Sequence, residues 1–170
     1  TGQGKSVFAD VIIPREVLRL LQVTPEAICK YYESWTYAKT FSGIMGMNIH
    51  VANALAALFI ACGQDVADIA MSHVGMLMYE MTEENDLYAG LYLPNLMVGT
   101  IGGGTGLGTQ KECLDIMGCY GTKNVKKFTE IVAVVALAGE LTCTAALVNK
   151  TYVRAHERYG RNKPEKSERI

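Results

Sequence analysis

The sequence lacks an excess of charge of either sign. Its 16 lysine and arginine residues balance 17 aspartate and glutamate residues, so the formal net charge is −1, and basic residues form no run. Proteins that bind nucleic acid or an anionic membrane usually present a basic patch. The balance of charge therefore argues against nucleic acid as a partner.

Paired cysteines are missing as well. The five cysteines, Cys29, Cys62, Cys113, Cys119 and Cys143, are odd in number, scattered and without a C-x-x-C pair. Structural zinc sites and disulfide-rich secreted domains need closely spaced or evenly numbered cysteines. We therefore expect reduced thiols, no metal site and a cytoplasmic location.

Long hydrophobic runs are also scarce. The longest, around Ile131 to Ala138, is far shorter than the roughly 18 to 20 residues that span a bilayer, and Glu140 closes it. The chain opens at Thr1 in a strand-like pattern without a signal sequence. We expect no membrane span, and we expect the chain to be a piece of a longer polypeptide.

Apolar residues in shorter patterns are plentiful, at 49% of 170 positions, which suffices for one domain with a sizeable core. The run from Asn48 to Cys62 is rich in alanine and leucine and stops at Gly63, which is typical of a helix end. From Val51 to Cys62 only Asn53 is polar, which predicts a central helix buried on all sides. An apolar stripe from about Asn124 to Val148 predicts a second core helix.

Strand patterns complete the prediction of an α+β fold with a small sheet. Lys5 to Ile13 alternates and ends before Pro14, and the segments Val74 to Met81 and Leu87 to Leu93 suit a hairpin. Shorter helices are expected in Pro14 to Leu21, Thr24 to Tyr37, Val66 to Met71, Gln110 to Met117 and Lys150 to Tyr159. The tail from Gly160, which includes residues 162–170, is expected to be disordered.

Three polar residues around the central helix are candidates for a site. His50 and Asn53 are three residues apart and share a helix face, where buried polar groups need hydrogen bonds. Asp65 follows the carboxyl end, where the helix dipole disfavours a carboxylate unless a cation is near. These residues are either satisfied core and turn residues or the lining of one functional cleft.

Six glycines occupy the ten residues from Gly99 to Gly108. So much glycine excludes a stable helix or strand, and the apolar flanks argue against a flexible linker. The spacing fits G-x-G-x-x-G in no register, so it does not predict a Rossmann nucleotide site. We expect the backbone here to approach a ligand or a packed neighbour closely.

The sequence G-T-I-G-G-G-T at Gly99–Thr105 resembles the G-T-V-G-G-G-T signature of the 3-hydroxy-3-methylglutaryl-coenzyme A (HMG-CoA) reductase family. Other family motifs follow in order: G-K-S-V at Gly4–Val7 with I-P at Ile13-Pro14, G-M-N-I-H-V-A-N at Gly46–Asn53, I-A-C-G-Q-D at Ile60–Asp65, D-L-Y at Asp86–Tyr88 and A-G-E-L at Ala138–Leu141. The resemblance spans Gly4 to Arg161 and is nearer the class of eukaryotes and archaea. It implies that residues 1–161 are the C-terminal part of the substrate-binding domain, without the small NADP-binding domain.

The resemblance implies reduction of (S)-HMG-CoA to mevalonate and coenzyme A with two NADPH, in isoprenoid biosynthesis, by a homodimer or higher homo-oligomer with shared active sites. Asp65 and His156 match the catalytic Asp and His of the family. The expected substrate-binding residues are His50, Asn53, Gln64 and Lys39, and the expected cofactor-binding residues are Gly102, Gly103, Gly104 and Thr105. The family's catalytic Glu and Lys belong to motifs that precede this chain, so the isolated chain is expected to be inactive.

One departure from the family keeps a second hypothesis open. Where the family has Lys-Asn-Leu, whose lysine contacts the substrate acid, this chain has Glu33-Ser34-Trp35, and Lys39 is the nearest replacement. The alternative is a non-catalytic paralogue or dimer partner that retains the fold. A membrane anchor upstream would place the protein on the cytosolic face of the endoplasmic reticulum instead of free in the cytoplasm.

Overall fold

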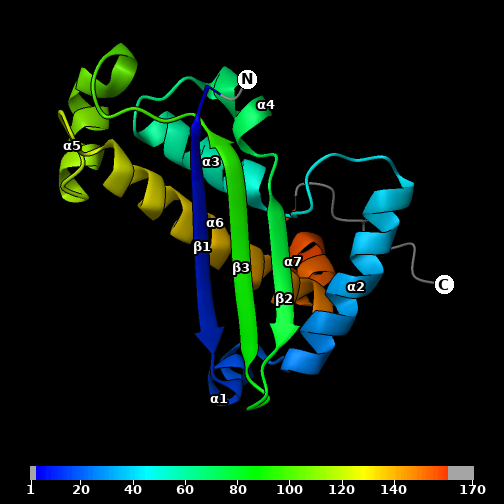
Figure 1. Ribbon diagram of the computed structural model, residues 1–170. Helices are drawn as coiled ribbons and strands as arrows, with labels where there is room; N and C mark the ends of the chain where they lie inside the picture. The colour runs from blue at the N-terminus through cyan, green and yellow to red at the C-terminus, as the bar shows by residue number, and fades with distance from the viewer. Residues whose placement is uncertain (1–2, 161–170) are drawn as a thin grey trace, which may run out of the picture.

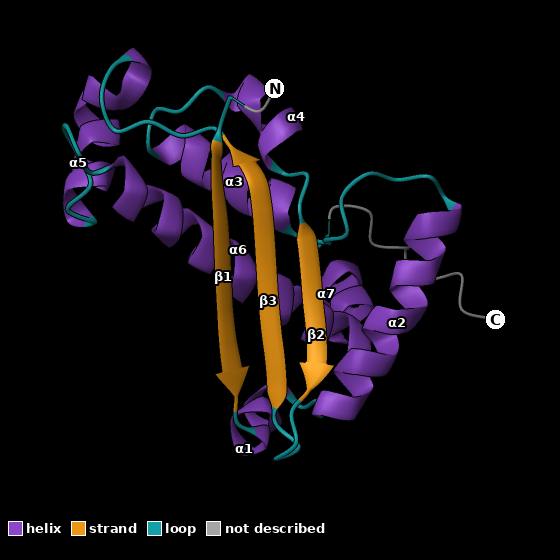
Figure 2. Ribbon diagram, in the orientation of Figure 1, coloured by secondary structure: helices purple, strands orange, loops and turns teal. Residues whose placement is uncertain are grey.

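The computed structural model describes residues 3–160 and shows the expected α+β architecture (Figure 1). Helices cover one face of a small antiparallel sheet (Figure 2). A single cluster of buried apolar side chains joins the sheet to the helices. The disorder expected for residues 162–170 lies outside the described residues.

Three strands form the sheet: β1 (Lys5–Ile13), β2 (Met76–Met81) and β3 (Leu87–Leu96). Their order is β1-β3-β2 with antiparallel pairing throughout, so the predicted strand and hairpin are confirmed. The hairpin turns at Asn85, whose φ of 65° suits the asparagine there. Asp86 then accepts a hydrogen bond from the backbone N–H of Arg15 at 2.9 Å, which ties the hairpin to the chain after β1.

The helices, including the short 3₁₀ turns η1 and η2, form around this sheet at or near their predicted positions, except for the 3₁₀ turn η3, which lies in the glycine-rich segment where no helix was expected. They are α1 (Arg15–Leu18), η1 (Arg19–Leu21), α2 (Pro25–Phe41), α3 (Val51–Ala61), η2 (Val66–Asp68), α4 (Ile69–Ser72), η3 (Gly103–Gly106), α5 (Gly108–Ile116), α6 (Val125–Val148) and α7 (Thr151–Tyr159). Thr24 caps the start of α2, because its Oγ1 accepts a hydrogen bond from the N–H of Ala27. α6 packs on β1, β3 and α3 and so lies at the centre of the core.

The prediction that α3 is buried on all sides is wrong. Val51, Leu55 and Phe59 are fully buried on the face that packs toward α6, but Ile60 on the opposite face is 65% exposed and Ala57 is exposed too. No element among residues 3–160 covers that second face. The all-apolar pattern identified the helix correctly, but it carries no information about which chain covers each face.

α6 is longer than its uninterrupted apolar run suggested. Its 24 residues include a window of mean hydropathy 2.2, so among the described residues it is the one helix long and apolar enough to cross a membrane. Its fully buried side chains, such as Phe128, Val132 and Ala136, pack into the core with the sheet and α3. We therefore interpret α6 as a core helix.

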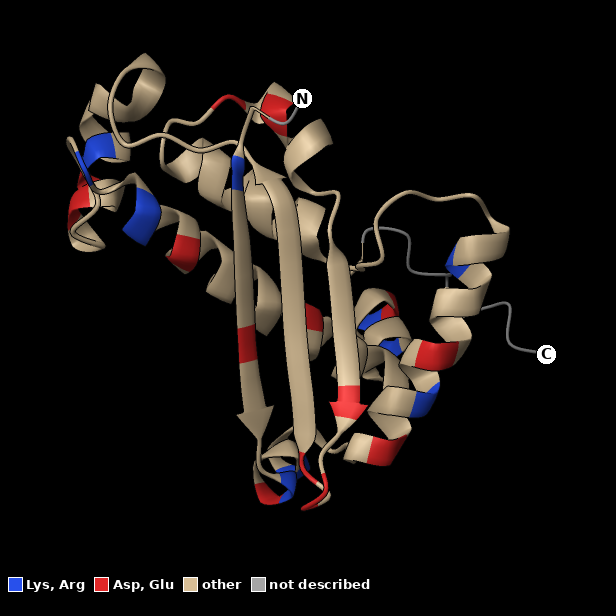
Figure 3. Ribbon diagram, viewed as in Figure 1, with Lys and Arg blue, Asp and Glu red and all other residues tan. Residues whose placement is uncertain are grey.

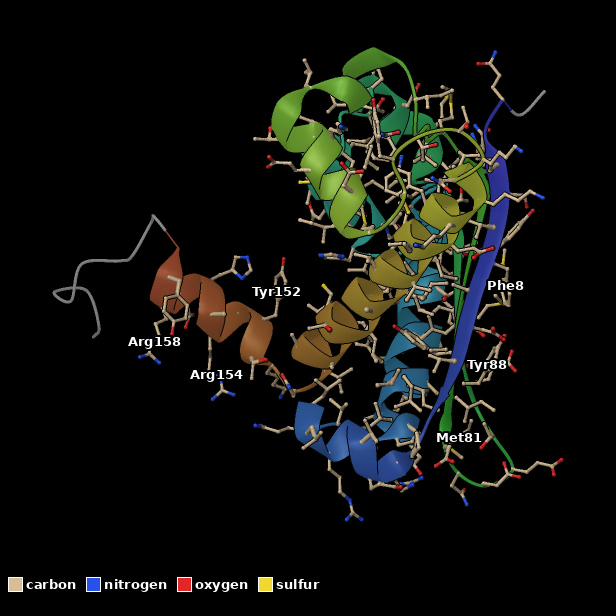
Figure 4. All side chains as sticks on the ribbon, turned by 90° about the vertical axis from the view of Figure 1, so that its left-hand side faces the viewer. Phe8, Met81, Tyr88, Tyr152, Arg154 and Arg158 are labelled. Carbon is tan, nitrogen blue, oxygen red and sulfur yellow. The ribbon has the colours of Figure 1, made fainter. Side chains whose placement is uncertain are left out.

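The outer face of the sheet is covered by no helix of the described residues. Figure 4 shows Phe8 and Tyr88 on the side of the sheet away from the helices. Phe8 and Ile12 are 49% and 58% exposed. At the centre lies Gly90, where a Cβ would be 3.3 Å from the ends of the Met78, Phe8 and Tyr88 side chains. Glycine therefore lets these side chains lie across the sheet, and charged residues are few over its body (Figure 3).

The uneven burial of α3 predicts unequal effects of two neighbouring substitutions. Phe59→Ala should lower the free energy of unfolding by about 3 to 5 kcal/mol, because it opens a cavity in the core. Ile60→Ala should change it by less than about 1 kcal/mol, because the side chain is already in water. Urea unfolding of both variants measures the difference, and equal losses would show that the second face of α3 is covered in solution.

Candidate functional site

Two hollows lie at opposite ends of α3. The first, of about 290 Å³, adjoins the carboxyl end of the helix, and we call it the glycine-loop hollow. The second, of about 430 Å³, adjoins the amino end, and we call it the α6 groove. The glycine-loop hollow is lined by Gln3, Lys5, Gly63, Gln64, Asp65, Asp68, Met97, Val98, Gly99, Ile101, Gly102, Gly103 and Thr105. The α6 groove is lined by His50, Ala138, Gly139, Thr142, Cys143, Ala146 and Tyr152.

The glycine-rich segment from Gly99 to Gly108, which we call the glycine loop, packs against the turn that ends α3. Gly63 has a φ of +66°, and a Cβ on it would collide with the carbonyl group of Gly104 and lie 2.8 Å from the N atom of Thr105. Thr105 Oγ1 donates a hydrogen bond to the Gly102 carbonyl at 2.6 Å, which closes the loop. The expected close backbone approach is therefore present, and Gly104 makes it with a packed neighbour.

Gln64 is held by both ends of its amide. Its Nε2 donates to the Cys62 carbonyl at 2.8 Å, and its Oε1 accepts from the N–H of Gly99 at 2.7 Å. The side chain thus joins the end of α3 to the start of the glycine loop. Burial raises the pKa of the adjacent Cys62 to about 11, so this thiol stays protonated at neutral pH.

Asp65 is exposed at the mouth of the same hollow. Its carboxylate accepts a hydrogen bond from the N–H of Ala67 at 2.9 Å and caps η2. The dipole of α3 disfavours this carboxylate, but the N–H groups of the next turn favour it. Lys5, which the sequence indicated only as part of a strand and of the G-K-S-V motif, brings a cation to the hollow, and its Nζ donates to the Val98 carbonyl at 2.7 Å.

His50 borders the α6 groove, where its ring lies against Gly139. A Cβ on Gly139 would collide with Nδ1 of His50 and lie 2.6 Å from Cε1. Nδ1 is buried and has no hydrogen-bond partner among the described residues. Glycine at position 139 therefore gives room to the imidazole ring of His50.

Glu140 is a functional candidate that sequence reasoning missed. It is fully buried in α6 and accepts hydrogen bonds from the backbone N–H groups of Ile49, His50 and Val51 at the start of α3. Burial raises the pKa of Glu140, although these N–H groups and the nearby His50 oppose the shift. The signals in the sequence were an acid inside an apolar helix and the A-G-E-L motif, and neither assigned a role to Glu140.

His156 lies on α7, which extends away from the sheet (Figure 4). It is exposed, its Nδ1 lies 2.8 Å from the Tyr152 carbonyl, and its ring is 4.3 Å from the Tyr152 ring. Because Tyr152 lines the α6 groove, His156 is adjacent to that groove. Lys39 and Asn53 line neither hollow: Lys39 lies over the Trp35 ring on α2, at 4.9 Å, and Asn53 is exposed on α3.

The structure therefore divides the predicted site residues into two groups. Asp65, Gln64 and the glycine loop meet at one end of α3, while His50 lies at the other, and His156 contacts Tyr152 at the edge of the α6 groove. The 11 residues of α3 separate the two by about 16 Å at the usual rise per residue. Our prediction that His50 and Asn53 share one cleft with Asp65 is wrong within a single chain. The roles of these residues remain predictions.

The family model of hydroxymethylglutaryl-coenzyme A reductase matches residues 1–161. The chain belongs to this family. It is 43% identical to the 3-hydroxy-3-methylglutaryl-coenzyme A reductase of Pyrococcus abyssi, with 94% of this chain and 41% of that protein covered. The enzyme of Methanocaldococcus jannaschii is 42% identical, with coverage of 94% and 40%. That of Xenopus laevis is 35% identical, with coverage of 95% and 20%.

Membership of the reductase family confirms the resemblance that the glycine-loop motif suggested. The chain spans about two fifths of the length of its archaeal relatives. Groups of three or more His, Cys, Asp or Glu side chains able to hold a metal do not occur in the described part of this reductase chain. Glu33 is exposed on α2.

The contact between Gly63 and the glycine loop predicts a position-specific effect in this reductase chain. Gly63→Ala and Gly102→Ala both place a side chain at positive φ, which costs about 1 to 2 kcal/mol. Only Gly63→Ala also meets the Gly104 backbone, whereas nothing lies within 4 Å at Gly102. We expect Gly63→Ala to destabilise the chain by about 1 to 3 kcal/mol more. Equal midpoints in urea unfolding would contradict the packing described here.

Proposed function

We propose that this chain forms part of an enzyme that reduces (S)-HMG-CoA to mevalonate and coenzyme A with NADPH, in isoprenoid biosynthesis. Supporting this are the family match over residues 1–161 and the names of the relatives. Because the chain spans 41% of the Pyrococcus abyssi protein, the complete reaction requires groups outside it. The family's catalytic Glu and Lys belong to that remainder.

The separation of the two hollows is the observation that shapes this proposal. Asp65 and the glycine loop lie at one end of α3, and His50 lies at the other, in the groove that Tyr152 separates from His156. A single substrate has to meet both groups. We therefore propose a homodimer in which one copy supplies the glycine-loop hollow and its partner supplies the α6 groove. A two-fold axis would form two identical sites of this kind.

The glycine-loop hollow suits the part of the site where the hydride is transferred. Gly102 and Gly103 are exposed, with φ of 79° and 53° and open space where a Cβ would be, so a flat ring can lie against bare backbone there. NADPH, when bound, supplies the hydride. Reduction of a thioester carbonyl builds negative charge on its oxygen, which a cation stabilises. In this proposal Asp65, which is exposed at the hollow, holds a lysine from outside this chain beside that oxygen.

The α6 groove suits the part of the site that binds the thioester substrate. Its lining is mostly apolar, from Ala138, Gly139 and Ala146, and can enclose an acyl or pantetheine chain. His156 lies next to it on α7 and is exposed. When the thioester breaks, the leaving coenzyme A thiolate needs a proton, which an imidazole can donate near neutral pH.

Glu33 supports a second candidate, a non-catalytic dimer partner that retains the fold. The acidic residue replaces a lysine that contacts the substrate acid in the family, and Lys39 stacks on Trp35 away from both hollows. Turnover by the complete protein decides between the two candidates. A complete protein that binds HMG-CoA but does not reduce it would support the second.

Co-expression of two inactive variants tests the shared site. In the complete protein, Asp65→Asn and His156→Gln should each lose most activity, but mixed dimers should recover about one quarter of the wild-type rate, because half of the dimers carry one intact site. A matched control pairs Asp65→Asn with the double variant, where no intact site can form. Recovery no greater than in that control would place the whole site within one chain.

The role of His156 can be tested by comparing two substrates, HMG-CoA and free mevaldehyde. His156→Gln should slow reduction of the thioester by about a hundredfold or more, because only that step expels a thiolate. Reduction of free mevaldehyde should be nearly unchanged, whereas Asp65→Asn should slow both steps. Steady-state kinetics with HMG-CoA and with mevaldehyde gives the comparison. Equal losses for His156→Gln on both substrates would rule out thiolate protonation.

A further inference from the structure

Two consecutive residues of α6 hold His50 from different directions. Glu140 accepts from the backbone N–H groups of Ile49 and Val51, at 2.9 and 2.7 Å, and from that of His50 between them. His50 itself provides no side-chain cap for α3. A residue 90 positions away in sequence therefore fixes the backbone of His50.

Gly139 holds the ring of the same histidine. The imidazole lies where a Cβ of residue 139 would be, with Cε1 2.6 Å from that position. Glycine in a helix interior normally destabilises it by about 1 kcal/mol relative to alanine. A glycine in the middle of the 24-residue α6 is therefore explained by the room it gives to His50.

The two contacts leave one ring nitrogen for a ligand. Nδ1 is buried without a hydrogen-bond partner in residues 3–160, and Nε2 makes no hydrogen bond within the same residues. The ring borders the α6 groove beside Cys143 and Tyr152. Nε2 is therefore the atom of His50 able to form a hydrogen bond with a molecule in the groove.

We infer that Gly139 and Glu140 are positioning residues that together hold His50 so that Nε2 binds the polar acyl end of the thioester substrate in the α6 groove. The inference rests on the proposed function. Glu140 sets the position of the His50 backbone, and Gly139 sets the orientation of its ring. Glu140 is fully buried and acts through His50, whereas Gly139 also lines the groove.

Three variants separate the two contacts. Gly139→Ala displaces the ring and leaves the Glu140 hydrogen bonds in place, while Glu140→Ala removes the backbone contact. Glu140→Gln is the conservative rescue, because Oε1, which accepts from His50 and Val51, is retained. The exposed Glu130→Gln on the same helix is the matched control.

Ring resonances of the three histidines report the position of His50 without any assay of activity. In ¹H–¹³C spectra of the chain, Gly139→Ala and Glu140→Ala should shift the His50 signals, while those of His73 stay in place. Glu140→Gln should shift them less, and Glu130→Gln should not shift them. Unmoved His50 signals in Gly139→Ala would overturn the inference even if Glu140→Ala fails to fold.

Kinetics of the complete enzyme test the purpose of this positioning. Gly139→Ala should raise KM for HMG-CoA by about tenfold, as expected for one lost hydrogen bond, with kcat changed much less. His50→Ala should have the same effect. If His50→Ala leaves KM unchanged, the substrate assignment of the groove fails. If His50→Ala raises KM but Gly139→Ala does not, the positioning role alone fails.

Discussion

A buried carboxylate at the start of α3 is the interaction on which the arrangement of this domain depends. The first turn of any helix leaves backbone N–H groups without partners, and here no side chain of the turn itself caps them. Glu140 accepts from two of them, those of His50 and Val51, and from the N–H of Ile49 just before the helix, each worth about 1.5 to 3 kcal/mol when the acceptor is charged. Burial of the carboxylate offsets much of this gain. What remains is a fixed angle and register between α6 and α3.

The register of α3 on α6 sets the location of both hollows. Once the amino end of α3 is fixed at Glu140, its 11 residues determine where Gly63 meets the glycine loop. The α6 groove and the glycine-loop hollow are thus coupled through one rigid element. In the proposed dimer, the two halves of each active site would be aligned by helix packing, which is more precise than alignment by loops.

The secondary structure could be predicted from the sequence because it depends on local patterns. The strand Lys5–Ile13, the hairpin at Asn85 and the start of α2 at Thr24 each follow from alternation, turn residues or caps. The burial of α3 could not be predicted, since an apolar face looks the same whether this chain or another covers it. Glu140 was missed because its partners lie about 90 residues away.

The candidate site was predictable only in part. The glycine loop and Asp65 meet as neighbours of one turn, and motif order in the sequence suggested both. The distance from Asp65 to His50 depends on the length and direction of α3, which motifs do not encode. Lys5 was overlooked because its role at the hollow follows from sheet pairing, which places β1 beside the end of β3.

The exposed outer face of the sheet lowers the solubility of this chain. Phe8 and Ile12 stand about half in water on an edge strand whose backbone groups are unpaired on one side within the described residues. A net charge of −1 provides almost no electrostatic repulsion between molecules. Attraction between apolar patches is then unopposed, and it strengthens in sulfate or phosphate salts. Solubility of the isolated chain should therefore be limited by its surface before it is limited by its fold.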